Sequence, residues 1–302
     1  MKKHLIIIFL LLLSFVTQAQ FEVPRLSQYL NNGLVNNPAY AGSREALSFT
    51  GVGRSIYSGF DGNPTGFLAA LHSPIKKGNI ALGVSVENKS YPGYSNTGVY
   101  THYAFRTWLG GMRLSLGLRA GLYNYSLDYS GLDVKDPMDR AFDSESGFAP
   151  NFGTGIYLYN NKFFLGFSVP YLLNLPDSTG STGFNPLSYR YLMTTGYLFD
   201  ISDNFKLKST VMAEYSISGI DLQGGFNFIL FKDKIWLGSL YRNTSKTLTS
   251  IIEVQVSDPM RLGIAYDYSF SNLGMMPGGG SFEVMFRYEF NFVSDIDSPF
   301  YF

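Results

Sequence analysis

The sequence predicts an all-β protein, and more narrowly a single-chain transmembrane antiparallel β-barrel of about 14 strands. Three observations predict this fold: the composition, the alternation of apolar and polar side chains, and the lengths of the connections. Aromatic residues make up 17% of the 302 residues and there are 32 glycines, a mixture that favours strands with glycine at bends. The formal net charge is zero, so charge indicates no nucleic-acid partner.

Residues 1–19 are predicted to be a secretory signal peptide. Lys2 and Lys3 precede an apolar run over residues 5–16, and a small-residue cleavage site ends at Ala19. The run is shorter than the ~20 apolar residues of a membrane-spanning helix, which argues against the alternative of a helical anchor. The chain contains no cysteine, so neither a cysteine-linked lipid anchor nor a disulfide framework is expected.

Residues 20–45 are predicted to form a periplasmic N-terminal segment with little regular structure, because turn signals such as Pro24 and Pro38 interrupt it. Two interpretations of this segment remain open. It could plug the lumen of the barrel or dock periplasmic partners. Alternatively, residues 38–43 only shape the entry into the first strand, with Gly42 making the turn.

From residue 46 onward, strand-length runs alternate with a period of two residues, so each strand has one apolar and one polar face. In residues 112–123, for example, Leu114, Leu116 and Leu118 alternate with polar or small residues. An even number of strands is predicted, within a barrel over residues 46–292 followed by a periplasmic tail over residues 293–302. The predicted strands are 46–57, 65–73, 79–88, 96–107, 112–124, 150–159, 162–169, 188–200, 204–215, 220–231, 234–242, 247–257, 260–270 and 281–291.

The connections between these strands sort by length. Connections on one side are short, whereas residues 125–149, 170–187 and 271–280 form long loops on the other side. Short periplasmic turns and long outer loops are typical of bacterial outer-membrane barrels, and a soluble two-sheet sandwich gives no reason for such sorting. With both termini periplasmic, we expect aromatic girdles near the strand ends, supplied by Tyr123, Tyr189, Tyr191, Tyr266 and Tyr268.

The first and last strands are expected to pair, because hydrocarbon leaves no water for an unpaired strand edge. Residues 281–290 would then lie beside residues 47–54, with their aromatic face in lipid. The polar faces carry both signs of charge, which predicts ion pairs and a filled or narrow lumen. These lumen residues are Arg54, Glu87, Arg106, Arg113, Arg119, Arg190, Lys206, Lys208, Glu214, Glu253, Arg261, Asp267, Glu283, Arg287 and Glu289.

No catalytic, cofactor or metal site is predicted, and the protein is interpreted as non-enzymatic. His72 beside Ser73 and His102 within a strand are the residues a barrel hydrolase would need, but their pattern fits satisfied lumen histidines better. The acidic loop over residues 128–146 could supply calcium ligands, although its spacing matches no twelve-residue calcium loop. A solvated outer loop is the favoured interpretation of it.

Several motifs resemble the PorP/SprF family of type IX secretion system membrane proteins, over essentially the whole mature chain. The most specific is Asn-Asn-Pro-Ala-Tyr-Ala-Gly-Ser at residues 36–43, where relatives often have Ile-Asn-Pro at its start. The chain also runs past Phe290, where many relatives stop. Further motifs lie at residues 27–29, 59–64, 72–74, 95–100, 114–121, 166–170, 235–238 and 261–268.

The resemblance implies an outer-membrane barrel that binds, exports or anchors a secreted cell-surface protein, which in the branch of the family associated with gliding is a large surface adhesin. It also implies contacts with outer-membrane lipid and with periplasmic type IX components, including a peptidoglycan-binding lipoprotein. The alternative function is a passive or substrate-selective outer-membrane channel. Candidate partner-binding or lumen residues are Asn37, Pro38, Ala39, Tyr40, Gly42, Phe60, Asp61, Arg113 and Arg119.

Overall fold

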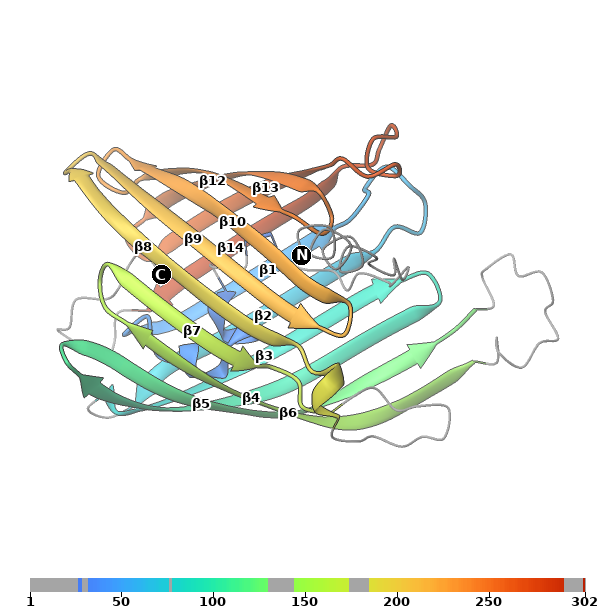
Figure 1. The fold of residues 1–302 in the computed structure, drawn as a ribbon, viewed down its shortest axis with the longest axis horizontal. Helices are drawn as coiled ribbons and strands as arrows, with labels where there is room; N and C mark the ends of the chain where they lie inside the picture. The colour runs from blue at the N-terminus through green and yellow to red at the C-terminus, as the bar shows by residue number, and fades with distance from the viewer. Residues whose placement is uncertain are drawn as a thin grey trace, which may run out of the picture.

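The computed structural model describes residues 27–28, 32–75, 78–129, 144–173, 185–290 and 301. Over these residues the chain forms a closed antiparallel barrel (Figure 1). The strands are β1 (Leu47–Ser55), β2 (Thr65–Ile75), β3 (Ile80–Tyr91), β4 (Tyr94–Leu109), β5 (Met112–Leu127), β6 (Glu145–Tyr159), β7 (Phe163–Val169), β8 (Tyr191–Ser202), β9 (Phe205–Ser216), β10 (Gly219–Leu230), β11 (Ile235–Arg242), β12 (Thr247–Ser257), β13 (Met260–Ser269) and β14 (Ser281–Phe290).

The barrel closes between its first and last strands. β1 pairs with β14 in a register that runs from Leu47 opposite Phe290 to Ser55 opposite Phe282. Every other strand pairs with its neighbours in sequence, so no described strand has a free edge. The predicted strand count and the predicted closing pair are both confirmed.

The two ends of the barrel differ in their connections. At the short-turn end the strands are joined by residues such as 110–111, 160–162, 203–204, 231–234 and 258–259. Gly110 and Gly111 both have positive φ, the conformation that a tight two-residue hairpin requires and that glycine adopts without strain. The long-loop end carries residues 56–64, 128–144, 170–190 and 270–280, although 92–93 and 217–218 are short hairpins at that end.

Side chains sort onto the two faces of the barrel as the alternation predicts. Along β4, Val99, Tyr103 and Phe105 are exposed on the outer face, whereas His102 and Arg106 are buried inside. The outer apolar band suits hydrocarbon, in which a charged side chain would be costly. Among the described residues, no helix is long and apolar enough to cross a membrane.

One of the predicted girdle tyrosines belongs to the interior instead. Tyr123 is less than a tenth exposed, whereas Tyr266 and Tyr268 lie on the outer face as predicted. Tyr189 precedes β8 and packs beside Tyr191. Tyr123 occupies an inward position of β5, where it packs beside Tyr125. Proximity to a strand end does not set the face of a side chain, because the face follows the two-residue period.

We predict that the outer face tolerates charge only near the rims. Leu118→Arg, on the outer face of β5, should destabilise the membrane-inserted barrel by about 2–4 kcal/mol if it lies near the midplane. Ile217→Arg, in an exposed hairpin at the long-loop end, should cost about 0–1 kcal/mol. Urea unfolding from lipid vesicles measures both, and equal costs would contradict a lipid-facing β5.

Candidate functional site in the occupied lumen

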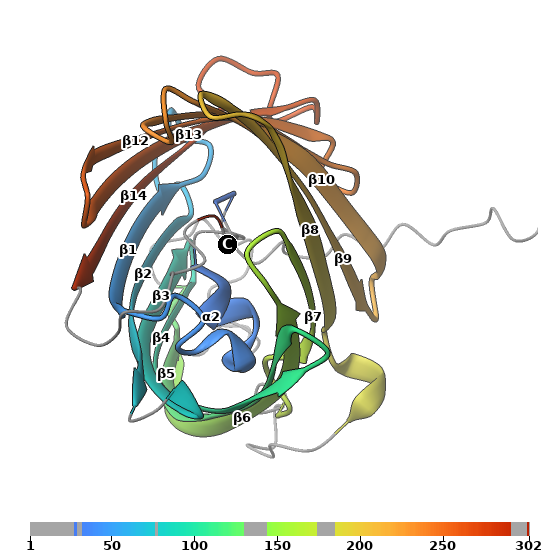
Figure 2. The same cartoon turned by 90° about the vertical axis from the view of Figure 1, so that its left-hand side faces the viewer.

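The interior of the barrel is occupied by the chain's own N-terminal segment. Two short helices, α2 (Gly33–Asn36) and η2 (Pro38–Tyr40), lie inside the ring of strands (Figure 2). Leu34, Ala39 and Ala41 are fully buried, and η2 contacts β4, β5 and β6. The described part of the predicted N-terminal segment therefore fills lumen space, rather than only leading into β1.

Asn37 sets the turn between the two helices and ties it to the barrel wall. Its side-chain Oδ1 accepts a hydrogen bond from the Ala39 amide at 2.9 Å, which caps η2. Pro38 follows at the first position of η2, where its fixed φ suits a helix start. The Asn37 Nδ2 donates to the backbone carbonyl of Ile156 in β6 at 2.9 Å. One side chain therefore shapes the segment and fixes it to the wall.

Glycines in the wall make room for this close approach. A Cβ on Gly117 of β5 would lie 2.0 Å from the amide nitrogen of Ala39, and a Cβ on Gly155 of β6 would lie 2.1 Å from Oδ1 of Asn37. Both distances are far inside van der Waals contact. Gly117 and Gly155 are themselves paired in register across β5 and β6, so they form a flat strip of bare backbone against which η2 lies.

At the short-turn end, arginines bind the part of the segment that leads into β1. The Arg106 guanidinium donates to the Gly42 carbonyl and to the Glu45 carboxylate, the latter at 2.9 Å. Arg44 donates to Glu289 of β14 at 2.7 Å. The Gly42 amide donates to Nδ1 of His72 at 3.0 Å. Gly42 has a positive φ, and it makes the turn that the sequence predicts there.

Arg119 holds the middle of the segment. Its guanidinium donates to the Val35 carbonyl at 3.1 Å and pairs with Glu87 of β3. It also lies 3.6 Å from the centre of the Tyr100 ring, an arrangement that shields the ion pair from water. Arg119 is thus one of the lumen candidates that does contact the segment.

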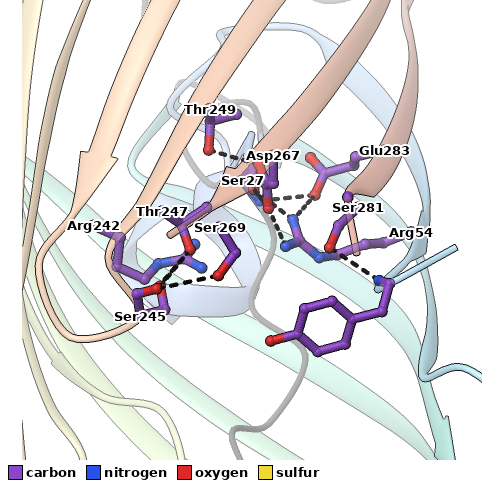
Figure 3. A network of polar contacts seen from close by, with 12 residues as sticks. Ser27, Arg54, Arg242, Ser245, Thr247, Thr249, Asp267, Ser269, Ser281 and Glu283 are labelled. Atoms are coloured by element: carbon purple, nitrogen blue, oxygen red, sulfur yellow. Dashed lines mark hydrogen bonds and ion pairs between the residues drawn. The ribbon is translucent and has the colours of Figure 1, made fainter. Parts of the chain in front are cut away.

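Nearer the long-loop end, a buried charge network binds Ser27 (Figure 3) and the adjacent Gln28. The amides of Ser27 and Gln28 donate to the two oxygens of Glu283, at 2.7 and 2.8 Å. Arg54 pairs with Glu283 at 3.0 Å and with Asp267. Three strands, β1, β13 and β14, therefore supply the charges of this network, and the segment supplies backbone donors.

Buried charges of this kind hold the segment in the lumen, because each charge depends on its partner for compensation. Removing one partner leaves a desolvated charge without compensation, which costs about 3–5 kcal/mol. Because the network residues come from both barrel and segment, the segment cannot leave the lumen without exposing several of these charges. The mixed signs predicted for the lumen are found as ion pairs, among them Arg54 with Glu283, Arg119 with Glu87 and Arg190 with Glu214.

The structure brings together most of the predicted site residues, but not all of them. The five from the segment, together with Arg119, form one contiguous lumen site. Arg113 lies apart at the short-turn end, and Phe60 and Asp61 lie in the connection between β1 and β2 at the long-loop end. The sequence did not reveal that Arg44, Gly117 and Gly155 contribute to this site, because neither an arginine before a strand nor a glycine within one carries a sign of what lies against it. The five segment residues are Asn37, Pro38, Ala39, Tyr40 and Gly42.

The histidines considered for catalysis have structural contacts in the wall. His72 packs edge-on against Tyr40 at 5.5 Å, and Ser73 donates to the Pro74 carbonyl at 3.0 Å. His102 Nε2 lies 3.0 Å from the Ser85 hydroxyl, and both side chains are almost fully buried. No cluster of three metal-binding side chains occurs among the described residues, and residues 130–143 of the acidic loop lie outside them.

Near the long-loop end, a tyrosine-rich cavity of about 290 Å³ opens above the segment. Tyr91 and Tyr94 stack in its wall with ring centres 4.7 Å apart, and Arg190 lies on the opposite side, paired in a fork with Glu214. Rigid aromatic rings beside polar groups are typical of surfaces that bind other macromolecules.

Of the predicted tail over residues 293–302, the structure describes Tyr301, which lies against the barrel at the short-turn end. Its ring stacks on Trp236 with centres 6.0 Å apart, and its hydroxyl donates to Asp233 at 2.9 Å. Lys208 donates to the Tyr301 carbonyl at 3.1 Å. Burial raises the pKa of the Tyr301 phenol above its ordinary value, so the hydroxyl stays protonated and can donate.

These features define a membrane-spanning β-barrel whose lumen is occupied by its own N-terminal segment. The particular family follows from a comparison of sequences. Residues 18–288 match the type IX secretion system membrane protein family PorP/SprF, and the chain belongs to this family. Fold and family together identify an outer-membrane barrel component of type IX secretion. No curated protein sequence matches the chain.

Solved structures with a similar fold include a transporter and a channel. The toluene transporter TbuX of Ralstonia pickettii is 9% identical with a TM-score of 0.52, and the match covers 85% of this chain and 93% of that one. The monoaromatic hydrocarbon channel CymD is 11% identical with a TM-score of 0.50, over 85% of this chain and 92% of that one. At such low identity the likeness extends to the fold alone.

We predict that a side chain at position 117 displaces the segment while leaving the barrel intact. Because the chain has no cysteine, Ala39→Cys provides a single thiol at a fully buried position, and it should react slowly with a maleimide in the folded protein. Adding Gly117→Ala should speed labelling at least tenfold, since the new Cβ would overlap η2.

Gly53→Ala is the matched control for this experiment, because no atom lies within 4 Å of a Cβ built there. It should leave the labelling rate unchanged. A heat-modifiability gel shift shows whether each variant still folds. Slow labelling of a folded Gly117→Ala variant would contradict the close packing of η2 on β5.

Proposed function

We propose that this protein is a non-enzymatic and non-conducting scaffold of type IX secretion. It binds a secreted cell-surface protein, such as an adhesin used in gliding, at its long-loop end, and it exports that protein or anchors it. At the short-turn end, which we infer to face the periplasm, it contacts the rest of the machinery, including a peptidoglycan-binding lipoprotein. Such a role consists of recognising other proteins, and it requires no catalytic group.

The observation that carries the proposal is the occupied lumen. Residues 27–28 and 32–45 lie in the interior, where the Arg54 network binds the first pair and Arg106 and Arg119 bind the second stretch. A freely conducting channel needs a continuous water path, whereas these contacts place desolvated ion pairs across the lumen. Two open spaces lie on opposite sides of this filled region: the tyrosine-rich cavity at the long-loop end, and a hollow at the short-turn end lined by Trp108, Arg113 and Tyr159.

We predict that the purified protein shows no large, steady conductance in planar lipid bilayers. Deleting residues 20–34 removes Ser27, Gln28 and the start of α2, and should open the lumen and raise the conductance. In cells, the same deletion should lower the amount of a type IX cargo at the surface. Removing the whole protein should have at least as large an effect on the cargo.

The alternative function as a channel gives the opposite results. A large conductance of the wild-type protein, together with normal cargo display in cells that lack it, would rule out the scaffold. The Gly53→Ala variant is the control in both assays, because it alters a strand without touching the segment.

A further inference from the structure

A hollow of about 500 Å³ opens at the short-turn end, beneath the hairpins that join β4 to β5 and β6 to β7. Trp108, Gly111 and Arg113 line it from the first hairpin, and residues 159–163 line it from the second. The helices of the N-terminal segment and Tyr301 do not line this hollow. Its walls combine aromatic rings with two cations, Arg113 and Lys162, and one carboxylate, Glu45, and the hollow is open to the outside.

Three of the lining residues form a row across the inner wall. Arg113 of β5 is the register partner of Trp108 in β4 and of Tyr159 in β6. The Arg113 guanidinium lies 4.2 Å from the centre of the Trp108 ring. Arg113 is 7% exposed, whereas Trp108 is 63% exposed. An almost buried guanidinium is therefore covered by an aromatic ring that itself faces solvent.

Apart from Arg113, the charged side chains around the hollow already have partners of opposite charge. Glu45 accepts from Arg106 at 2.9 Å and from the Tyr159 hydroxyl at 3.3 Å. Lys162 pairs with Asp200 at 2.8 Å. Within the described part of the chain, Arg113 forms no ion pair and no hydrogen bond to a carboxylate. In this it differs from buried arginines that do pair, such as Arg44, Arg54, Arg106, Arg119 and Arg261.

We propose that this hollow binds an acidic segment of a partner protein. A carboxylate of that segment pairs with Arg113, and Trp108 and Tyr159 shield the ion pair from water. The inference rests on the proposed function, because the partner is a component of the secretion machinery that reaches the short-turn end. Trp, Tyr and Arg are the residues that most often dominate the binding energy of interfaces.

A protein segment suits the hollow better than a small free anion does. Trp108 is more than half exposed at the rim, and Phe163 and Tyr197 add further aromatic lining. A ligand that carries a carboxylate next to apolar side chains would cover both kinds of surface. A free anion would leave the apolar rim exposed to water, so binding would gain no free energy from burying apolar surface.

The test uses the full chain in detergent and two synthetic peptides, acetyl-Leu-Glu-Phe-Glu-Leu-amide and its counterpart with both Glu replaced by Gln. Tryptophan emission reports binding, because the chain has two tryptophans and Trp236 is fully buried. We expect the Glu peptide to change the emission of Trp108 with saturation, and the Gln peptide to bind at least tenfold more weakly.

Arg113→Gln should weaken binding of the Glu peptide at least tenfold, and Arg113→Lys should have an intermediate effect because a lysine cannot form the two-pronged pair. Lys232→Gln removes the same charge from an exposed turn at the same end and should bind like the wild type. A gel shift on heating establishes that each variant is folded. The ion pair should also weaken as salt rises.

The inference is overturned if the wild type shows no saturable binding, if the two peptides bind equally, or if folded Arg113→Gln binds as tightly as the wild type. These outcomes leave the scaffold function untouched, because conductance and cargo display decide that function without the peptides. Conversely, if the wild type conducts but still binds the Glu peptide through Arg113, the peptide site is confirmed and the proposed scaffold function is wrong.

Discussion

Closure of the strand ladder is the constraint on which the rest of this structure depends. Hydrocarbon offers no water to unpaired backbone groups, and each unpaired group costs several kcal/mol. The pairing of β1 with β14 removes both edges at once and so permits the apolar outer band. Because neighbouring side chains of a strand point to opposite faces, the same closure turns the polar residues inward.

The inward polar face creates a second requirement, which the N-terminal segment meets. Arginines and carboxylates in a low-dielectric interior must be paired, and the segment brings further partners to them, such as Glu45 for Arg106 and the Val35 carbonyl for Arg119. Gly117 and Gly155 allow the segment to approach the wall closely. Barrel and segment therefore behave as one packed unit, which is the physical basis for a binding role.

The predictions from sequence succeeded where a regular period carried the information. The strand count, the closing pair and the inward position of residues such as His102 follow from a two-residue alternation that survives any loop conformation. The predicted tyrosine girdle was wrong for Tyr123, which was assigned by its place along a strand rather than by its face. Turn signals in the sequence located Asn37 and Gly42, but they did not identify the residues that Asn37 and Gly42 contact.

By itself, the sequence determined the barrel, its family and the polarity of its two faces, because these depend on local alternation and on recognisable motifs. The tertiary structure alone decided that Asn37 reaches the Ile156 carbonyl, that Gly117 lies under Ala39, and that Arg54 holds the segment through Glu283. The reason is physical. Each of these contacts joins residues far apart in the chain, and their meeting depends on the register and curvature of a closed sheet, which no local pattern encodes.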